Sequence, residues 1–95
     1  MEYTIEWDGE SKKNLNSLDN SVRQQVMRFI NKLEKTSNPK AFGEALTGNL
    51  AGYWKYRVGD YRIVADIQDN KLVILVIAID HRRKIYKKLN KRLNR

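Results

Sequence analysis

The sequence predicts a single α+β domain in which two helices precede an antiparallel sheet and a short basic helix ends the chain. Three observations predict it: helical periodicity confined to the first third, three strand-like segments between residues 53 and 79, and a strongly basic terminal segment at 81–95. A chain of 95 residues supports one modest hydrophobic core. We therefore treat residues 1–95 as one domain.

The first element is an N-terminal strand. Tyr3, Ile5 and Trp7 alternate with polar residues, which is typical of a half-buried strand. Asp8 then offers a helix N-cap, and a short helix is expected over residues 9–18.

A second, longer helix follows, and it carries the clearest amphipathic pattern. Ser21 and Gln24 have capping-box spacing, and Pro39 marks a connection after the helix. The predicted core face of this helix consists of Val22, Val26, Phe29, Ile30 and Leu33.

Residues 53–58 and 61–68 form a predicted hairpin. Gly59 and Asp60 suit a two-residue type II′ turn, which fixes the strand register. The turn predicts four facing pairs: Val58 with Tyr61, Arg57 with Arg62, Tyr56 with Ile63, and Lys55 with Val64. One face of the hairpin is then apolar and suited to the core, and the other carries Lys55, Arg57 and Arg62.

This cationic face is unusual, because like charges directly opposite each other cost up to about 1 kcal/mol. An anion, most simply a phosphate, would relieve the repulsion. The alternative is that the arginines form structural ion pairs with Asp66, Asp80 or Glu44.

The third strand of the meander, residues 71–79, contains an eight-residue apolar run and therefore suits the centre of a sheet. A two-residue turn at Asp69 and Asn70 would place His81 on the cationic face near Arg62. Because both faces of this strand are apolar, a slip of one residue would send His81 to the other face.

The basic excess is concentrated at the end of the chain. The net charge is +8, yet residues 1–80 hold 11 cations and 11 carboxylates. Residues 81–95 hold no carboxylate and eight cations: Arg82, Arg83, Lys84, Lys87, Lys88, Lys91, Arg92 and Arg95. Such a segment suits contact with a polyanion, although a solvated helix that aids solubility would have the same composition.

Several classes of protein receive no support. The chain has no cysteine and no metal, redox or nucleotide-cofactor motif, so we expect neither a metal nor a cofactor. Its longest apolar run is far shorter than the roughly 20 residues of a membrane-spanning helix. The start of the chain lacks secretory-signal character, and a cytoplasmic protein without membrane contact is expected.

At this point the segments "LTGNLAGYWKYRVGDYRIV" and "IDHRRKIY", in this order, resemble the RelE/ParE superfamily of bacterial toxins. The resemblance implies a microbial RNase-like RelE fold. It also implies a RelE-like mRNA interferase, a type II toxin that cleaves mRNA in the ribosomal A site by 2′-hydroxyl attack, without metal, and inhibits translation.

The resemblance also assigns residues. Lys55, Arg57 and Arg62 match the cationic hairpin positions, Arg82 or Arg83 matches the arginine after the last strand, and Tyr86 matches the tyrosine of the terminal helix. Considered as chemistry, Lys55 and His81 are candidate general bases and the arginines stabilise phosphorane charge. The candidate catalytic residues are Lys55, Arg57, Arg62, His81, Arg82 and Tyr86. The candidate RNA- or ribosome-binding residues are Arg83, Lys84, Lys87, Lys88, Lys91 and Arg92.

Two alternatives stay open. ParE-like members, which inhibit DNA gyrase, share this scaffold but generally lack the cationic set, and a basic RNA- or DNA-binding module would need no catalysis. Tyr86 could simply pack the terminal helix onto the core. The partners implied by the resemblance are a RelB-like antitoxin, the ribosome with its mRNA, and operator DNA through the antitoxin.

Overall fold

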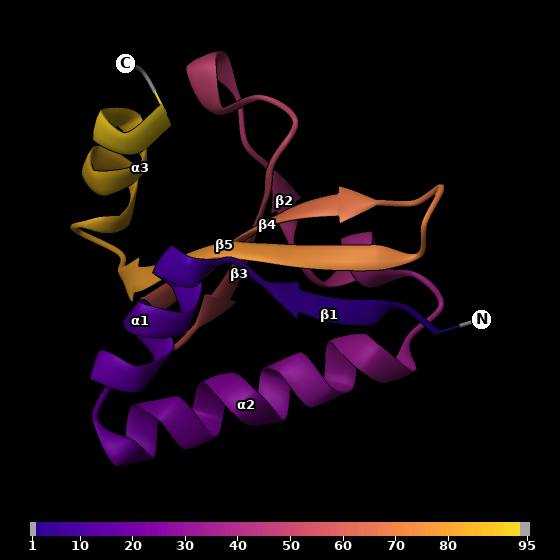
Figure 1. Ribbon diagram of the computed structural model, residues 1–95, viewed down its shortest axis with the longest axis horizontal. Coiled ribbons are helices and arrows are strands. Elements are labelled where there is room, and N and C mark those ends of the chain that lie inside the picture. Colours follow the sequence, from indigo (N-terminus) through magenta and orange to yellow (C-terminus); the bar gives the residue numbers. More distant parts are fainter. Residues whose placement is uncertain (1, 94–95) are drawn as a thin grey trace.

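The computed structural model describes residues 2–93 and contains one five-stranded sheet with helices on both faces (Figure 1). The strand order across the sheet is β1-β5-β4-β3-β2. The elements, in chain order, are β1 (Thr4–Trp7), α1 (Gly9–Ser17), α2 (Asn20–Lys35), the 3₁₀ helix η1 (Pro39–Phe42), β2 (Glu44–Ala45), the 3₁₀ helix η2 (Gly48–Leu50), β3 (Trp54–Val58), β4 (Tyr61–Gln68), β5 (Val73–His81) and α3 (Ile85–Leu93). No helix within residues 2–93 is long and apolar enough to cross a membrane.

The two N-terminal helices begin differently. Asp8 caps α1 as predicted, because its Oδ1 accepts a hydrogen bond from the Ser11 backbone N–H at 2.8 Å. The predicted capping box at the start of α2 is wrong. The Arg23 N–H already bonds the Asp19 carbonyl at 2.8 Å, so α2 begins at Asn20 and Ser21 lies inside its first turn.

The amphipathic face of α2 is confirmed. Val26, Ile30 and Leu33 are buried, and α2 lies along one face of the sheet (Figure 1). Two further predicted residues, Val22 and Phe29, pack partly buried against the same cluster. We call this cluster the main core; its buried members are Val26, Ile30, Leu33, Tyr56, Ile63, Ala65, Ile74, Val76 and Ile79.

The hairpin register is also confirmed, with Arg57 opposite Arg62 and Lys55 opposite Val64. A strand that the sequence did not predict extends the sheet beyond the hairpin. Strand β2 has only two residues, and it pairs Glu44 with Lys55. It therefore brings a carboxylate to the edge of the cationic face.

The predicted turn between β4 and β5 is wrong. Gln68 pairs with Val73, so four residues form the loop, and Leu72 within it adopts a positive φ of 53°. This change alone would keep His81 on the predicted face, because it shifts the register by an even number of residues.

A β-bulge reverses that outcome. Val64 pairs with Ala78 whereas its neighbour Ala65 pairs with Val76, which leaves Ile77 as the extra residue. Beyond the bulge His81 pairs with Tyr61. Its side chain therefore lies on the face opposite to that of Arg62, and the predicted position of His81 is wrong.

The N-terminal strand lies at the edge of the sheet and runs parallel to β5, with Thr4 opposite Val73. The predicted antiparallel arrangement therefore holds for β2 to β5 only. Strand β1 stops at Trp7, and past that point side chains occupy the edge of β5. The Asn14 Oδ1 accepts from the Ile79 N–H at 3.0 Å.

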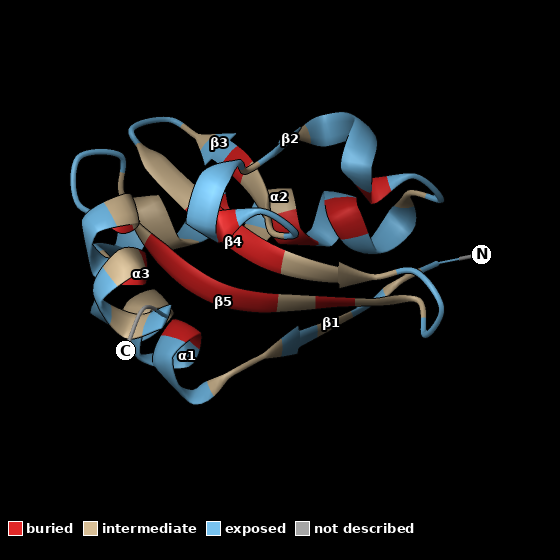
Figure 2. Ribbon diagram, turned by 90° about the horizontal axis from the view of Figure 1, so that it is seen from above, coloured by how far each residue is buried: buried red, intermediate tan, exposed pale blue. Residues whose placement is uncertain are grey.

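The second face of the sheet is only partly open. The helix α3 and the segment before β3 cover part of it and form a second core of six buried residues: Leu50, Val64, Ile77, Ala78, Ile85 and Leu89. Figure 2 shows buried positions along β4 and β5 and on α3. The rest of this face carries the cations of the hairpin.

Candidate functional site

The cationic side chains of the hairpin line one cleft. Lys55 and Arg57 from β3 and Arg62 from β4 surround a space of about 290 Å³, together with Phe42 and Glu44. The hairpin register explains the grouping, because alternate residues of two paired strands point to the same side. We call this space the cationic cleft.

The two arginines of the cleft are not neutralised. Within residues 2–93, neither Arg57 nor Arg62 forms an ion pair. Arg62 instead donates from Nη1 to the carbonyl oxygens of Gly59 at 3.0 Å and Tyr61 at 2.9 Å. These bonds fix the guanidinium against the turn while its charge stays available to an anion.

Within residues 2–93, none of the three carboxylates proposed as structural partners forms an ion pair with either arginine. Asp80 pairs with Lys88 at 3.0 Å, and the Asp66 carboxylate accepts from Gln68 Nε2 at 3.0 Å. Glu44 lies 4.0 Å from the Lys55 ammonium and is largely exposed. The alternative of structural ion pairs for the arginines is therefore not found among the described residues.

Lys55 links the cleft to the terminal helix. Its Nζ lies 5.9 Å from the centroid of the Tyr86 ring, and Tyr86 packs partly buried against the second core. Tyr86 can therefore pack the terminal helix onto the core and lie beside the cleft at the same time. A ring fixed in this way is suited to stack on a base or to orient a hydroxyl group.

Arg82 lies at the turn of the hairpin. Its backbone N–H bonds the Asp60 carbonyl at 2.8 Å, and its Nε is 4.0 Å from the Asp60 carboxylate. Arg62 bonds the neighbouring Gly59, so both arginines contact the same turn.

His81 is separated from these groups. Its ring packs edge-on against Tyr61, with ring centroids 5.6 Å apart. Its Nδ1 accepts a weak hydrogen bond from the Arg83 N–H at 3.3 Å. The structure therefore brings together Lys55, Arg57 and Arg62, with Tyr86 and Arg82 at the borders, and leaves His81 on the other face.

The cations of the terminal segment fall into two groups. Five line a shallow hollow on its outer surface: Arg83, Lys84, Lys87, Lys88 and Lys91. Arg92 has a different environment, since Nη1 donates to the Ile77 carbonyl at 2.6 Å and Nη2 pairs with Asp8. Arg92 thereby holds α3 against the edge of β5. Arg95 lies outside the described residues.

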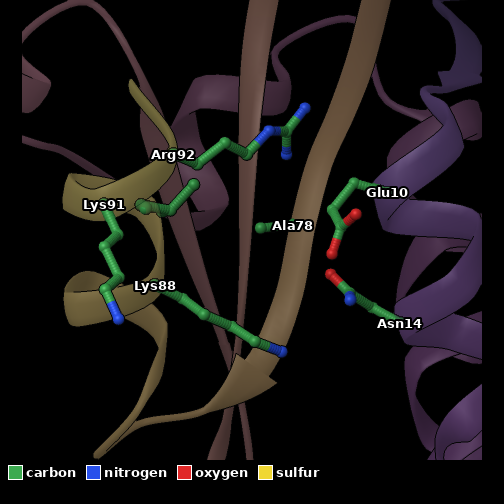
Figure 3. A pocket seen from close by; sticks show the side chains of 7 residues that line it. Glu10, Asn14, Ala78, Lys88, Lys91 and Arg92 are labelled. Carbon is green, nitrogen blue, oxygen red and sulfur yellow. The ribbon is translucent and has the colours of Figure 1, made fainter. Parts of the chain in front are cut away.

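Another hollow, of about 380 Å³, lies between α1 and α3. Figure 3 shows Glu10 and Asn14 of α1 facing the basic side chains of α3 across β5. A carboxylate and an amide opposite Lys88 and Arg92 make this hollow mixed in charge. It suits the attachment of α3 better than the binding of an anion.

The Asp8 carboxylate is the electrostatic anchor of that attachment. Partial burial alone would raise its pKa, but hydrogen bonds from the Ser11 backbone N–H and the Arg92 guanidinium outweigh burial and lower the pKa from the ordinary 3.8. The charged form of Asp8 is therefore the one that holds α1 and α3 together.

Two further residues line the cleft: Phe42, which was not predicted, and Glu44, which was considered only as an ion-pair partner of the arginines. The glycine between them carries the only sequence signal that could have found them. A side chain on Gly43 would collide with the Lys55 carbonyl and approach the Tyr56 ring to 2.7 Å. The glycine is needed because the segment passes directly against β3.

The described residues contain no group of three or more histidine, aspartate or glutamate side chains that could hold a metal ion. What the arrangement offers is a set of fixed cations beside an aromatic ring. Such a set can bind a phosphodiester and stabilise additional negative charge on it.

Comparison with known proteins gives the same family as the motifs. The pattern of the family described as "ParE toxin of type II toxin-antitoxin system, parDE" matches residues 5–86. The chain belongs to the RelE/ParE superfamily of toxins from type II toxin–antitoxin systems.

Named relatives span the whole chain. Toxin RelG of Mycobacterium tuberculosis is 27% identical over 88 residues, which cover 93% of this chain and 100% of RelG. The mRNA interferase toxin RelE of Escherichia coli is 28% identical over 96 residues, covering 98% of this chain and 99% of RelE.

Solved structures share the fold. The toxin–antitoxin complex RelBE2 of Mycobacterium tuberculosis contains a chain with a TM-score of 0.78 and 26% identity, over 85% of this chain and 99% of that one. A mutant of Escherichia coli RelE in the free state, at 24% identity, has a TM-score of 0.73 over 98% of this chain and 99% of its own. The predicted RelE-like α+β fold is confirmed.

Proposed function

We propose that this toxin is a ribosome-dependent endoribonuclease that cleaves mRNA in the A site and so inhibits translation. The observation that carries the proposal is the cationic cleft, where Lys55, Arg57 and Arg62 meet. Arg62 is held by the carbonyl oxygens of Gly59 and Tyr61, and within residues 2–93 neither arginine has a carboxylate within ion-pair distance. Two like charges fixed opposite each other destabilise the free protein and favour a bound phosphate.

The proposed reaction needs only groups that the cleft supplies. Lys55, as general base, takes the proton of an RNA 2′-hydroxyl, whose oxygen attacks the adjacent phosphorus while the bond to the 5′-oxygen breaks. Arg57 and Arg62 stabilise the charge that develops on the phosphorane oxygens. A 2′,3′-cyclic phosphate forms, and the leaving 5′-oxygen takes a proton from water.

Tyr86 and the exposed cations of the terminal segment complete the proposal. Tyr86, next to Lys55, stacks on a base of the mRNA. Ribosomal or messenger phosphates are bound by the exposed cations Arg83, Lys84, Lys87 and Lys91. Lys88, which pairs with Asp80 in the free protein, also contacts these phosphates. Because Arg92 is engaged with Asp8 and Ile77, we assign it to the attachment of α3.

The named relatives support this branch, since one carries the name mRNA interferase. The matched family pattern carries the name ParE and favours a second candidate function, inhibition of DNA gyrase without catalysis. The cationic cleft is the feature that a gyrase inhibitor would not need.

The proposed partner is a RelB-like antitoxin, since several solved relatives are complexes of RelB with RelE. The composition of the antitoxin follows from the surface of the toxin that it must cover. An acidic segment would cover the cleft and an amphipathic segment would cover apolar surface. Contact with operator DNA would come through this antitoxin, and the site of action would be the cytoplasm.

Purified ribosomes carrying a defined mRNA provide the test. Wild-type protein should cut the mRNA once per ribosome in a single-turnover reaction, mapped by primer extension. Lys55→Ala should slow cleavage by about 10²-fold or more, and Lys71→Ala, which removes an exposed lysine of the β4–β5 loop, should not.

A parallel supercoiling assay with DNA gyrase separates the two candidate functions. Inhibition of gyrase together with intact mRNA would refute the nuclease proposal.

A further inference from the structure

Phe42 is the largest exposed apolar side chain beside the cleft. It is 39% exposed, and it contributes to the cationic cleft on one side and to a second open hollow on the other. The second hollow measures about 540 Å³ and is otherwise lined by residues of α2 and its end: Arg28, Asn31, Lys32, Lys35 and Thr36. A single aromatic ring thus joins two basic surfaces.

The backbone on both sides of Phe42 is anchored to β3. Tyr56 donates from its hydroxyl to the Pro39 carbonyl at 2.8 Å, and Trp54 donates from Nε1 to the Lys40 carbonyl at 3.1 Å. On the other side of the ring, Gly43 packs so closely on β3 that no side chain fits there. Both flanks of Phe42 are therefore tied to β3, and the exposed ring lies between them.

The cations of α2 beside the ring form a stripe. Arg28, Lys32 and Lys35 recur at helical spacing, are exposed, and within residues 2–93 take part in no ion pair. The Lys32 ammonium lies 4.3 Å from the centroid of the Phe42 ring. An aromatic ring with unpaired cations around it is the combination that holds single-stranded nucleic acid.

We infer that Phe42, Arg28, Lys32 and Lys35 form a second RNA-binding surface, continuous with the cationic cleft. A base stacks on Phe42, and the flanking phosphates lie along the α2 stripe. The inference rests on the proposed function, because it assumes that the polyanion bound in the cleft is RNA. It adds a binding surface outside the reacting groups, which would hold the strand as it leaves the cleft.

An acidic polypeptide is the competing occupant, since it would also match the charge. The ring argues for RNA, because carboxylate side chains gain nothing from an exposed phenyl group, whereas every base has a face that stacks on it. Stacking of one base is worth about 1–3 kcal/mol by alanine substitution, which is a factor of about 5 to 150 in affinity.

The test uses a fluorescent 12-nucleotide single strand of 2′-O-methyl RNA, which cannot be cut because it lacks the attacking hydroxyl. Anisotropy titrations across a salt series should show Phe42→Ala binding at least 5-fold more weakly. The triple variant Arg28→Gln, Lys32→Gln, Lys35→Gln should reduce the slope of log K against log salt by about 2, since each phosphate contact on a single strand contributes about 0.7.

A charge-matched triple, Lys12→Gln, Lys13→Gln, Lys71→Gln, removes three exposed cations elsewhere and should leave the slope nearly unchanged. An oligoglutamate of equal charge should bind Phe42→Ala as well as it binds the wild type. Thermal unfolding of every variant checks that the fold persists.

Equal weakening by the two triples would overturn the proposal, because binding would then depend on net charge alone. The proposal would also be overturned if Phe42→Ala weakened the binding of oligoglutamate as much as the binding of RNA. That result would indicate a protein-docking surface. Because the probe is not cleavable, these outcomes do not depend on whether the nuclease proposal holds.

Discussion

The two faces of the sheet are built from alternate residues of the same strands, yet one is a packed apolar core and the other carries an open cationic cleft. On the face beneath α2, Tyr56 and Ile63 are fully buried in the main core. On the other face, their neighbours Arg57 and Arg62 stand opposite each other in an open cleft. One face is packed along its length, and the other has a small core at one end and unpaired charge at the other.

Under the proposed function, stability and activity depend on different sides of one hairpin. Substitutions on the packed face should change the free energy of unfolding, and substitutions in the cleft should change catalysis.

Leu33→Ala should give the largest effect on stability. Leu33 is fully buried between α2 and the sheet, where truncation leaves a cavity and costs about 2–5 kcal/mol. The matched change Leu89→Ala in the second core should cost less, because α3 can shift toward the sheet and fill part of the space. Urea unfolding measures both, and equal costs would mean that the second core is as rigid as the main one.

Arg62→Ala should give the largest effect on activity. Removing one fixed charge-stabilising donor costs about 10²- to 10³-fold in rate, while the fold should be unchanged or slightly more stable because the opposed charges are relieved. Single-turnover cleavage of ribosome-bound mRNA and thermal unfolding measure the two quantities, with Arg23→Ala on α2 as the control. Early unfolding of Arg62→Ala, with activity lost in proportion, would make this arginine structural.

Asp8→Ala should have an intermediate effect on stability. The change removes both the cap of α1 and the partner of Arg92, and about 1–3 kcal/mol should be lost at neutral pH. Because the pKa of Asp8 is lowered in the folded state, its charge stabilises the protein above the ordinary value of 3.8, and that contribution disappears as the pH falls below it.

Asp8→Asn isolates the charge, since asparagine also caps helices. Below pH 3.8 the wild type should lose stability faster than Asp8→Asn as acid is added. Parallel acid unfolding curves for the two proteins would show that the ion pair with Arg92 contributes nothing.

Lys84→Gln, Lys87→Gln and Lys91→Gln together should weaken ribosome binding modestly and make it less salt-dependent, because fewer counterions are released. The cleavage rate at saturation should not change, since these side chains lie outside the cleft. The triple Lys12→Gln, Lys13→Gln, Lys71→Gln again serves as the control. Unaltered binding at every ionic strength would leave the basic helix as a solubilising surface.

His81→Ala should have the smallest effect. The ring lies against Tyr61 on the face away from the cleft, so the cleavage rate should stay within about 2-fold of the wild type. A loss of about 10²- to 10⁴-fold, the range for a general base, would show that His81 reaches the RNA when the ribosome is bound.

The sequence predicted the hairpin and the α2 face well for physical reasons. A two-residue turn at Gly59 and Asp60 leaves one register, and strict alternation then decides which side chains share a face. The cationic cleft follows directly from that register. The pattern of α2 was equally decisive, because its apolar residues recur at helical spacing.

The errors arose where the sequence leaves the choice to packing. In the apolar run of β5, a bulge next to Ala78 exposes no polar residue to the core and leaves no mark in the pattern. A two-residue strand such as β2 is too short for any periodicity. The stripe on α2 was missed because the charge was summed over residues 1–80, which are neutral in total, although Arg28, Lys32 and Lys35 recur at helical spacing.

The connection between β1 and β5 has a consequence for how the protein is made. Thr4 pairs with Val73, and Asp8 meets Arg92 across 84 residues of sequence. Contacts this distant slow folding, and the N-terminal strand emerges from the ribosome long before its partner exists. A chain still in synthesis therefore lacks β5, the strand that pairs with β1, and the attachment of α3. Each copy becomes a complete toxin only after almost all of its residues have been translated.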